Sequence, residues 1–208
     1  MSFTLWLSLL GASTLISFTP GAGAINTMTN AMRQGYRRSI WGILGQQIAL
    51  LIHVVIVAAG VGLLVANSPT AFNLIRYAGA AYLVYLGVRM MLSVPDVASP
   101  GHGSGHALTR WQMIRRGILV NLLNPKAIIF FLAFTPQFID PAQPLLGQYL
   151  VFIGTIVTVD VLVMFFFFAA TARSFQRFTA TQRGAKALNI LFGILFIVVA
   201  AMLVFVHQ

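Results

Sequence analysis

Six long runs of apolar residues, separated by short polar or basic segments, dominate the pattern along the chain. Each run has about the 20 residues that an α-helix needs to cross a bilayer. The pattern therefore predicts an all-α membrane protein with six transmembrane helices. The predicted spans run from about 3 to 32, 40 to 66, 70 to 92, 113 to 137, 146 to 171 and 187 to 206.

Two of these spans contain a proline that should break the helix. Residues 19–23 (TPGAG) interrupt the first span, and residues 121–126 (NLLNPK) interrupt the fourth. Because proline lacks a backbone N–H and clashes with the preceding turn, we expect breaks at Pro20 and Pro125. A broken helix in each half of a membrane protein is a pattern typical of a transport site in the middle of the bilayer.

The composition also indicates a membrane protein. The chain of 208 residues is 59% hydrophobic and 8% charged, whereas soluble domains carry about a quarter charged residues. The net charge of +10 does not indicate a nucleic-acid partner, because the cations form no basic stripe with interleaved aromatics. The absence of cysteine excludes disulfides, thiolate metal sites and thiol catalysis.

Lys and Arg residues predict the orientation through the positive-inside rule. Most of the 13 cations lie in or beside the connections between spans one and two, three and four, and five and six, whereas segments 67–73 and 137–147 contain none. We therefore expect a multi-pass protein with both termini in the periplasm. The cations that carry this prediction are Arg33, Arg37, Arg38, Arg89, Arg110, Arg115, Arg116, Arg173, Arg177, Arg183 and Lys186.

The beginning of the chain has one feature of a cleaved signal, because residues 22–24 (AGA) resemble a cleavage site. No Lys or Arg precedes Arg33, so the positively charged segment of a secretory signal is missing. We expect the first span to remain uncleaved.

The break in the fourth span has the residues of a helix start inside the membrane. Asn124 is a favourable N-cap and Pro125 a favourable first helical residue, so unpaired N–H groups and the positive end of a helix dipole would face the interior. Lys126 adds a full charge beside them. From Arg116 to Pro125 is about 14 Å of helix, which reaches near the middle of the membrane. Together with Asn121, this start suits a carboxylate. The alternative is a proline kink with a lysine that extends to the membrane surface.

The first break offers a similar arrangement from the opposite side of the membrane. Thr19 is a candidate cap for the helix that follows, Pro20 frees neighbouring backbone groups, and Gly21 permits close approach of a solute. These groups are candidates for binding the polar part of a small solute. The same small residues are also typical of a tight helix–helix interface, so both interpretations remain open.

Asp160 is the one acidic residue inside a predicted span. A carboxylate at this depth has to be paired, protonated or functional. It is a candidate for accepting a substrate ammonium or for carrying a coupling proton. The alternative is a purely structural ion pair with Lys126.

Other polar side chains lie on the second, third and fifth spans. Gln47, Thr155 and Thr158 are candidates for lining a cavity. His53 is expected to be a hydrogen-bonded core histidine rather than a proton relay. Arg76 is expected to extend toward the lipid headgroups at the outer surface.

Orientation and sequence together predict two inverted repeats, because spans one to three begin outside and spans four to six begin inside. Residues 18–22 parallel residues 123–127, and Gly79 has a counterpart in Gly193. We expect a first three-helix repeat at 1–92, a cytoplasmic linker at 93–112 and a second three-helix repeat at 113–208.

The predicted linker contains a candidate metal site. His102 and His106 are four residues apart in a segment rich in Gly, Pro and Ser. Because no further ligand accompanies them, a flexible linker is the favoured interpretation. We expect no metal site and no cofactor, and the absence of a nucleotide-binding loop argues against direct use of ATP.

Several segments resemble the LysE/RhtB family of amino-acid exporters, over essentially the whole chain. Residues 19–29 (TPGAGAINTMT) resemble the amino-terminal signature, residues 76–87 the motif of the third span, and residues 121–138 the most specific segment. With residues 160–164 (DVLVM), the similarity is greatest to the members that export homoserine and homoserine lactone. Ala22 departs from the pattern, because many members have a second proline there.

This resemblance implies a secondary transporter of the bacterial inner membrane. It would export small neutral amino acids (homoserine, homoserine lactone, threonine-like) by proton antiport, with Asp160 as the candidate proton carrier, and would form a homodimer. The expected partners are the amino acid, protons and the lipid bilayer, with no nucleic acid. Another amino acid, such as leucine or lysine, is an alternative substrate.

Three other classes of function remain alternatives. A divalent cation exporter would need more ligands than this chain offers, because its spans contain a single carboxylate and no thiols. An intramembrane enzyme would need a buried Ser–His or two-carboxylate arrangement, which the spans do not provide, so we expect no enzymatic activity. A passive channel would contain the same broken helices and differs only in lacking uphill flux.

Overall fold

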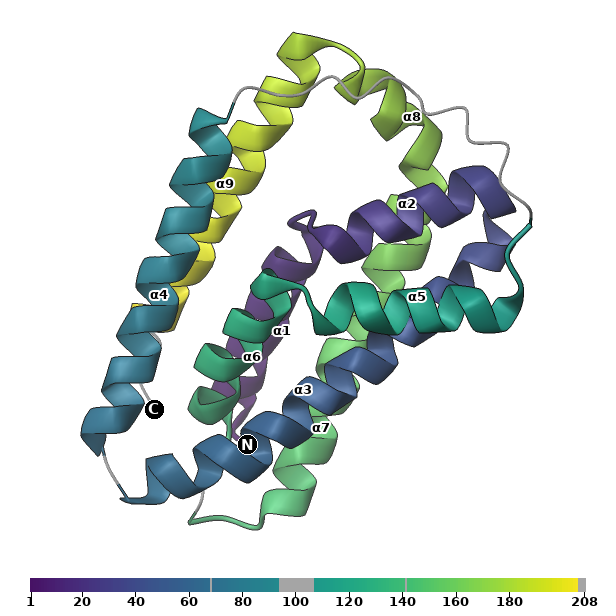
Figure 1. Ribbon diagram of the computed structural model, residues 1–208. Helices are drawn as coiled ribbons and strands as arrows, with labels where there is room; N and C mark the ends of the chain where they lie inside the picture. The colour runs from purple at the N-terminus through teal and green to yellow at the C-terminus, as the bar shows by residue number, and fades with distance from the viewer. Residues whose placement is uncertain (68, 94–106, 141, 206–208) are drawn as a thin grey trace.

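The computed structural model describes residues 1–67, 69–93, 107–140 and 142–205, with the side chains of residues 61–69, 71, 72 and 75 left aside. Within these ranges the chain is helical and has no strand, which confirms the prediction of an all-α membrane protein (Figure 1). The helices are α1 (Phe3–Phe18), α2 (Ala22–Gln34), α3 (Ile40–Asn67), α4 (Pro69–Leu92), α5 (Arg110–Leu122), α6 (Pro125–Phe138), α7 (Leu145–Leu162), α8 (Ala170–Thr179) and α9 (Gln182–Phe205), with a 3₁₀ turn η1 (Arg37–Ser39) and a π-helical segment η2 (Val163–Ala169).

Three helical segments of the described chain are long and apolar enough to cross a membrane, namely Arg37–Gly60, Leu145–Thr179 and Gln182–Phe205. The number rises to five when each of two bent pairs is taken as one span: α1 with α2, bent by 57°, and α5 with α6, bent by 62°. These bends lie at Pro20 and Pro125, so the predicted breaks are confirmed. Because α4 is not among the five, the count of six spans stays a prediction.

The ends of the shorter helices follow from residues with capping side chains or unusual backbone angles. Thr109 begins α5 with a capping box, in which its hydroxyl accepts from the Gln112 N–H at 3.2 Å and the Gln112 side chain accepts from the Thr109 N–H at 2.8 Å. Gly35 ends α2 with a φ of 96°, in the left-handed region that favours glycine. The chain can therefore turn sharply between α2 and α3.

The helices pack in pairs that join the two halves of the chain. The α1 helix packs against α7, α3 packs against α5 and α6, and α4 lies along α9 (Figure 1). A two-fold relation between the halves would convert the contact of α1 with α7 into that of α5 with α3. It would leave the contact of α4 with α9 unchanged. These pairings are compatible with inverted repeats, but the repeats and their boundaries at 92 and 113 stay a prediction.

Glycines set the closest approach of α4 and α9. A Cβ at Gly87 would lie 2.7 Å from the Gly193 carbonyl oxygen, and one at Gly193 would lie 2.6 Å from that of Gly87. Gly193 is thus the contact partner of Gly87. The correspondence of Gly79 with Gly193 between the two repeats is a separate prediction, which this contact does not test. Gly79 instead faces α6, where an added Cβ would lie 2.5 Å from the Cβ of Ala133.

The packed centre of the molecule contains a row of buried aromatic rings. Phe130, Phe134 and Phe138 follow one face of α6, and Phe138 lies 6.2 Å from Phe152 of α7 between ring centroids. Within a membrane such rings stabilise the fold by close dispersion contacts, since lipid is as apolar as the core. They hold α6 against its neighbours directly beside the break at Pro125.

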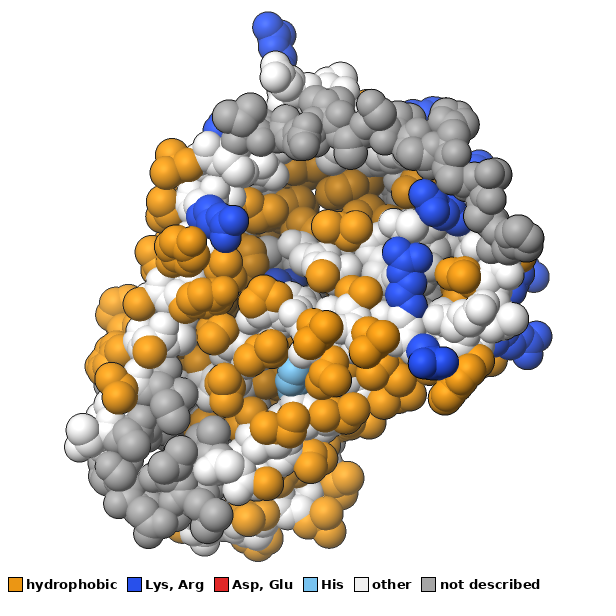
Figure 2. Space-filling model, viewed as in Figure 1, with side chains coloured by type: hydrophobic (Ala, Val, Ile, Leu, Met, Phe, Trp, Pro, Cys, Tyr) orange, Lys and Arg blue, Asp and Glu red, His pale blue; other side chains and the backbone are white. Residues whose placement is uncertain are grey.

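Cationic side chains and the chain termini lie toward opposite ends of the molecule. The start of α1 and the end of α9 lie in the lower part of Figure 1, while most of the Lys and Arg side chains visible in Figure 2 lie in the upper and right-hand parts. This separation is the one that the positive-inside rule predicts for a protein with both termini on one side.

Arg76 departs from its predicted position. Its side chain is buried, with Nε donating to the Leu203 carbonyl oxygen at 2.8 Å and Nη2 donating to the carbonyl oxygen of Val204. A helix leaves its last carbonyl groups unpaired and carries a partial negative charge there. Arg76 therefore caps the end of α9 instead of extending to lipid headgroups.

Candidate functional site

At the first break, α1 ends and α2 begins with different capping residues. Thr19 ends α1: its N–H donates to the carbonyl oxygens of Leu15 and Ile16, and its hydroxyl donates to that of Leu15 at 2.8 Å. Gly21 is the N-cap of α2 and offers no side chain to the first N–H groups. The prediction of Thr19 as cap of the following helix is therefore wrong, because its hydroxyl bonds backward along the chain.

The second break has the predicted helix start. Asn124 is the N-cap of α6, with its Oδ1 accepting from the Lys126 N–H at 3.1 Å, and Pro125 is the first helical residue. Proline is favourable here because its missing N–H would have no partner inside the helix. The sequence pattern at 124–126 is thus sufficient to end α5 and restart the helix in a new direction.

Lys126 connects the two breaks. Its Nζ donates to the Ile16 carbonyl oxygen at 2.7 Å and also to the Thr19 carbonyl oxygen. Its alkyl chain passes Gly21, where an added Cβ would lie 3.4 Å from the Lys126 Cδ. The ammonium group therefore stabilises the carbonyl end of α1 rather than extending to the membrane surface.

Asp160 faces the same region from α7 without bonding to Lys126 directly. Its Oδ2 accepts from Gln47 Nε2 at 2.7 Å, and its Oδ1 accepts from the Ser17 hydroxyl at 3.2 Å. Two donors thus stabilise the carboxylate. Asp160 and Lys126 therefore do not form the direct ion pair that was the structural alternative for Asp160.

A network of amides joins the second break to α3 and α2. Asn124 Nδ2 donates to Asn121 Oδ1 at 3.4 Å, and Asn121 Nδ2 donates to the Gln46 carbonyl oxygen at 3.1 Å. Gln46 Nε2 in turn donates to the Gly23 carbonyl oxygen at 3.1 Å and to the Thr27 hydroxyl at 3.0 Å. The network fixes both breaks against the same face of α3.

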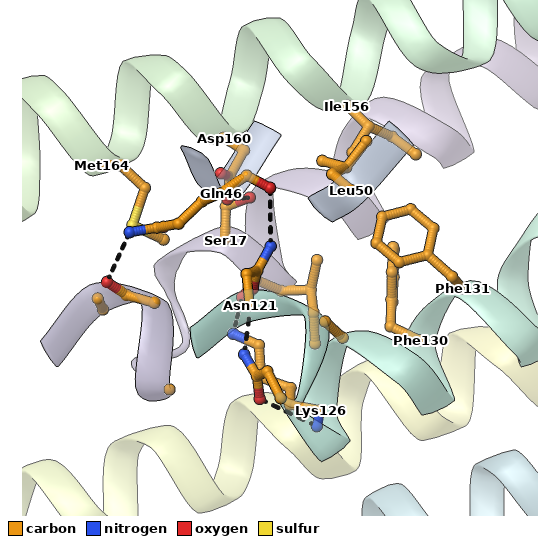
Figure 3. Close-up of a pocket in the computed structure, with 16 residues that line it drawn as sticks. Ser17, Gln46, Leu50, Asn121, Lys126, Phe130, Phe131, Ile156, Asp160 and Met164 are labelled. Atoms are coloured by element: carbon orange, nitrogen blue, oxygen red, sulfur yellow. Dashed lines mark hydrogen bonds between the residues drawn. The ribbon is translucent and has the colours of Figure 1, made fainter. Parts of the chain in front are cut away.

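The side chains of both breaks enclose a cavity of about 50 Å³ (Figure 3). Figure 3 shows Asp160 and Ser17 on one side, Lys126 on another, and Phe130 and Phe131 on a third. A volume of this size holds one or two water molecules. The polar lining side chains are Ser17, Gln46, Asn121, Asn124, Lys126 and Asp160, and the larger apolar ones are Ile16, Leu50, Phe130, Phe131, Ile156 and Met164.

Most of the predicted site residues meet at this cavity. Gly21, Asn121, Asn124, Lys126 and Asp160 line it. The remaining members act at its edge: Thr19, Pro20 and Pro125 shape the breaks, and Gln47 reaches Asp160.

Two candidates lie elsewhere, and two polar residues that line the cavity were not predicted to do so. Thr155 accepts from Trp6 Nε1 at 3.1 Å and Thr158 is exposed, so neither lines the cavity. Ser17 and Gln46 line it instead. Gln46 had a visible signal, since an amide in the middle of an apolar span needs a partner.

His53 behaves as the predicted core histidine. Its side chain is buried, and its Nε2 lies 3.3 Å from the Asn121 carbonyl oxygen. Among the described residues, no group of three or more His, Cys, Asp or Glu side chains is placed to hold a metal ion. His102 and His106, the candidate pair in the linker, lie outside the described residues.

A helical membrane protein with two broken helices around a small charged cavity belongs to the class of membrane translocators. The profile of the LysE type translocator family matches residues 14–206, so the chain belongs to that family and is not an enzyme. No solved structure matches the chain significantly.

Named relatives cover nearly the whole chain. It is 42% identical over 206 residues to the homoserine/homoserine lactone efflux protein of Salmonella typhimurium, covering 98% of this chain and 97% of the relative. It is 38% identical to an uncharacterized membrane protein of Vibrio cholerae, covering 94% of each chain. The leucine efflux protein of an Enterobacter species is 29% identical, over 97% of this chain and 95% of the relative.

Proposed function

We propose that the protein exports homoserine, homoserine lactone and threonine-like small neutral amino acids from the bacterial cytoplasm by proton antiport. The observation that carries this proposal is a cavity between two broken helices with a cation, a carboxylate and an apolar wall. A zwitterionic amino acid has the complementary charges and a short side chain. The similarity over the whole chain to a protein named for homoserine efflux supports the choice of substrate.

The carboxylate of the substrate would bind at the starts of α2 and α6. The first N–H groups of α2 have no capping side chain, because Gly21 is the N-cap. Helix N-termini with free N–H groups and a positive dipole end favour anions. Lys126 supplies the full charge, and the amides of Asn121 and Asn124 supply hydrogen-bonding groups at the same wall of the cavity.

Asp160 would carry the coupling proton. It is the one acidic side chain in the described part of the cavity wall, and its two hydrogen-bond donors, Gln47 and Ser17, suit the ionised form. A carboxylate that is alternately protonated from outside and deprotonated toward the cytoplasm can exchange a proton for a substrate. Pro20 and Pro125 would keep the backbone groups around it free to bind.

Counterflow in proteoliposomes tests this function. Vesicles loaded with unlabelled homoserine should take up labelled homoserine, and an imposed proton gradient should drive its accumulation above equilibrium. Threonine should compete more strongly than leucine or lysine, because the cavity is small and has no second carboxylate among the residues described. Counterflow without gradient-driven accumulation would identify a carrier without proton coupling, and equilibration without counterflow would identify a passive channel. No homoserine flux would reject the proposed substrate.

We propose further that the protein lies in the inner membrane as a homodimer, with both termini in the periplasm. The chain has no cysteine, so single cysteines can report topology without background. A cysteine at Ser2 should react with a membrane-impermeant maleimide in intact spheroplasts. A cysteine at Ala180, between α8 and α9, should react only after the membrane is permeabilised; the reverse pattern would invert the orientation.

A further inference from the structure

The carbonyl end of α1 already binds an ammonium group in this structure. Lys126 Nζ donates to the carbonyl oxygens of Ile16 and Thr19, in the last turn and cap of α1. Carbonyl groups at a helix C-terminus carry a partial negative charge and can accept further donors, although the Ile16 carbonyl oxygen also accepts from the Thr19 N–H at 3.2 Å. The end of α1 thus has the geometry of a binding site for a primary ammonium.

The cavity between the two breaks is small for an amino acid, so a larger site requires part of its wall to move. Its volume of about 50 Å³ suits water rather than a solute with several non-hydrogen atoms. Asp160 and Gln46 are each held by two hydrogen bonds, and Asn124 is held as the cap of α6. Lys126 also makes two hydrogen bonds, but its unbranched chain with four rotatable bonds can carry the ammonium group to a new partner without moving the backbone.

We propose that the carbonyl oxygens of Ile16 and Thr19 form the site for the substrate's ammonium group, and that Lys126 occupies this site in the empty transporter. The inference rests on the proposed function, because it assigns a subsite within the same cavity. When the zwitterion enters, its ammonium replaces that of Lys126 at the carbonyl groups. Lys126 turns to the substrate carboxylate, so each charged group exchanges one partner for another.

This exchange couples binding to the two breaks. In the empty state Lys126 ties α6 to the end of α1, and the substrate removes that tie by taking the place of its ammonium. Among the side chains that line the cavity, the titratable ones are Lys126 itself and Asp160 on α7, while α1 has none. Asp160 therefore remains the acidic group beside the proposed ammonium site.

Small ammonium ions test the site without transport. In the variant Lys126→Ala the carbonyl site is vacated, so ethylammonium should raise the melting temperature of the purified protein in a concentration-dependent manner. Tetramethylammonium has the same charge but no N–H donor and should have no effect. Ethylammonium should not stabilise the wild type or Lys126→Arg, in which a side-chain cation still occupies the site.

Lys126→Ser also removes the ammonium group and vacates the site, and it serves as the second variant if Lys126→Ala does not fold. Absence of ethylammonium stabilisation in a folded neutral variant, or equal stabilisation of the wild type, would overturn the proposal.

The wild-type protein provides an arm that does not depend on any variant. The α-hydroxy acid analogue of homoserine keeps the carboxylate and loses the ammonium, so it should compete with labelled homoserine at least about tenfold more weakly than homoserine itself. Equal competition would overturn the ammonium site. If the wild type binds no homoserine while ethylammonium still stabilises Lys126→Ala, the proposed substrate is rejected and the carbonyl site is supported.

Discussion

Replacing Asp160 by Asn should abolish gradient-driven export of homoserine and leave the protein folded in the membrane. Asparagine has nearly the shape of aspartate, its Oδ1 can still accept from Gln47 Nε2, and its Nδ2 can donate to the Ser17 hydroxyl. The hydrogen bonds are therefore retained, whereas the group that can bind and release a proton is lost. Accumulation driven by an imposed proton gradient should fall to that of vesicles without protein.

Asp140→Asn is the matched control for this substitution. Asp140 follows α6 in the connection to α7, outside the cavity, and its Oδ1 accepts from the Ala142 N–H at 2.9 Å. The control makes the same chemical change and should retain accumulation close to that of the wild type. Uphill export by Asp160→Asn at the wild-type rate, with equal amounts of protein in the vesicles, would exclude Asp160 as the proton carrier.

The breaks were predictable because their causes are local. A proline at the first position of a helix, preceded by an asparagine N-cap, defines a helix start in six residues, and the structure has that start at Pro125. Pro20 in the middle of an apolar run likewise excludes a continuous helix. Lys126 and Asp160 stood out for the same kind of reason, since a charge in an apolar span requires a partner.

The partners of these charges could not be predicted, because they depend on how distant helices pack. Lys126 bonds to carbonyl groups 110 and 107 residues away in the chain, and Arg76 to carbonyl groups 127 and 128 residues away. The sequence indicates how deep in the membrane such a side chain lies, but not which helix end it bonds to.

Local ambiguity explains the other differences. Thr19 stands between two helices and has a hydroxyl that suits either, so its choice of Leu15 depends on geometry. Gln46 and Gln47 are adjacent and therefore point about 100° apart around α3. Only the rotation of α3 determines that Gln46 lines the cavity while Gln47 reaches Asp160.

Gly117→Ala should destabilise the protein and abolish transport with it. A Cβ at Gly117 of α5 would lie 2.2 Å from the Gly42 carbonyl oxygen of α3. The contact is with backbone, so no side-chain rotation can relieve it, and α5 has to move away from α3. Overpacking of this kind costs about 3 kcal/mol, measurable as a lower melting temperature in detergent.

The loss of transport follows from the position of Gly117 one turn before Asn121. Moving α5 from α3 lengthens the hydrogen bond of 3.1 Å from Asn121 to the Gln46 carbonyl oxygen and displaces the cap of α6 that follows it. Gly154→Ala in α7 is the matched control, since its added Cβ meets nothing within 4 Å. Alanine favours a helix over glycine by up to about 1 kcal/mol, so the control should be as stable as the wild type or slightly more so. Equal stability and counterflow in both variants would mean that close contact of α3 and α5 is not what positions the second break.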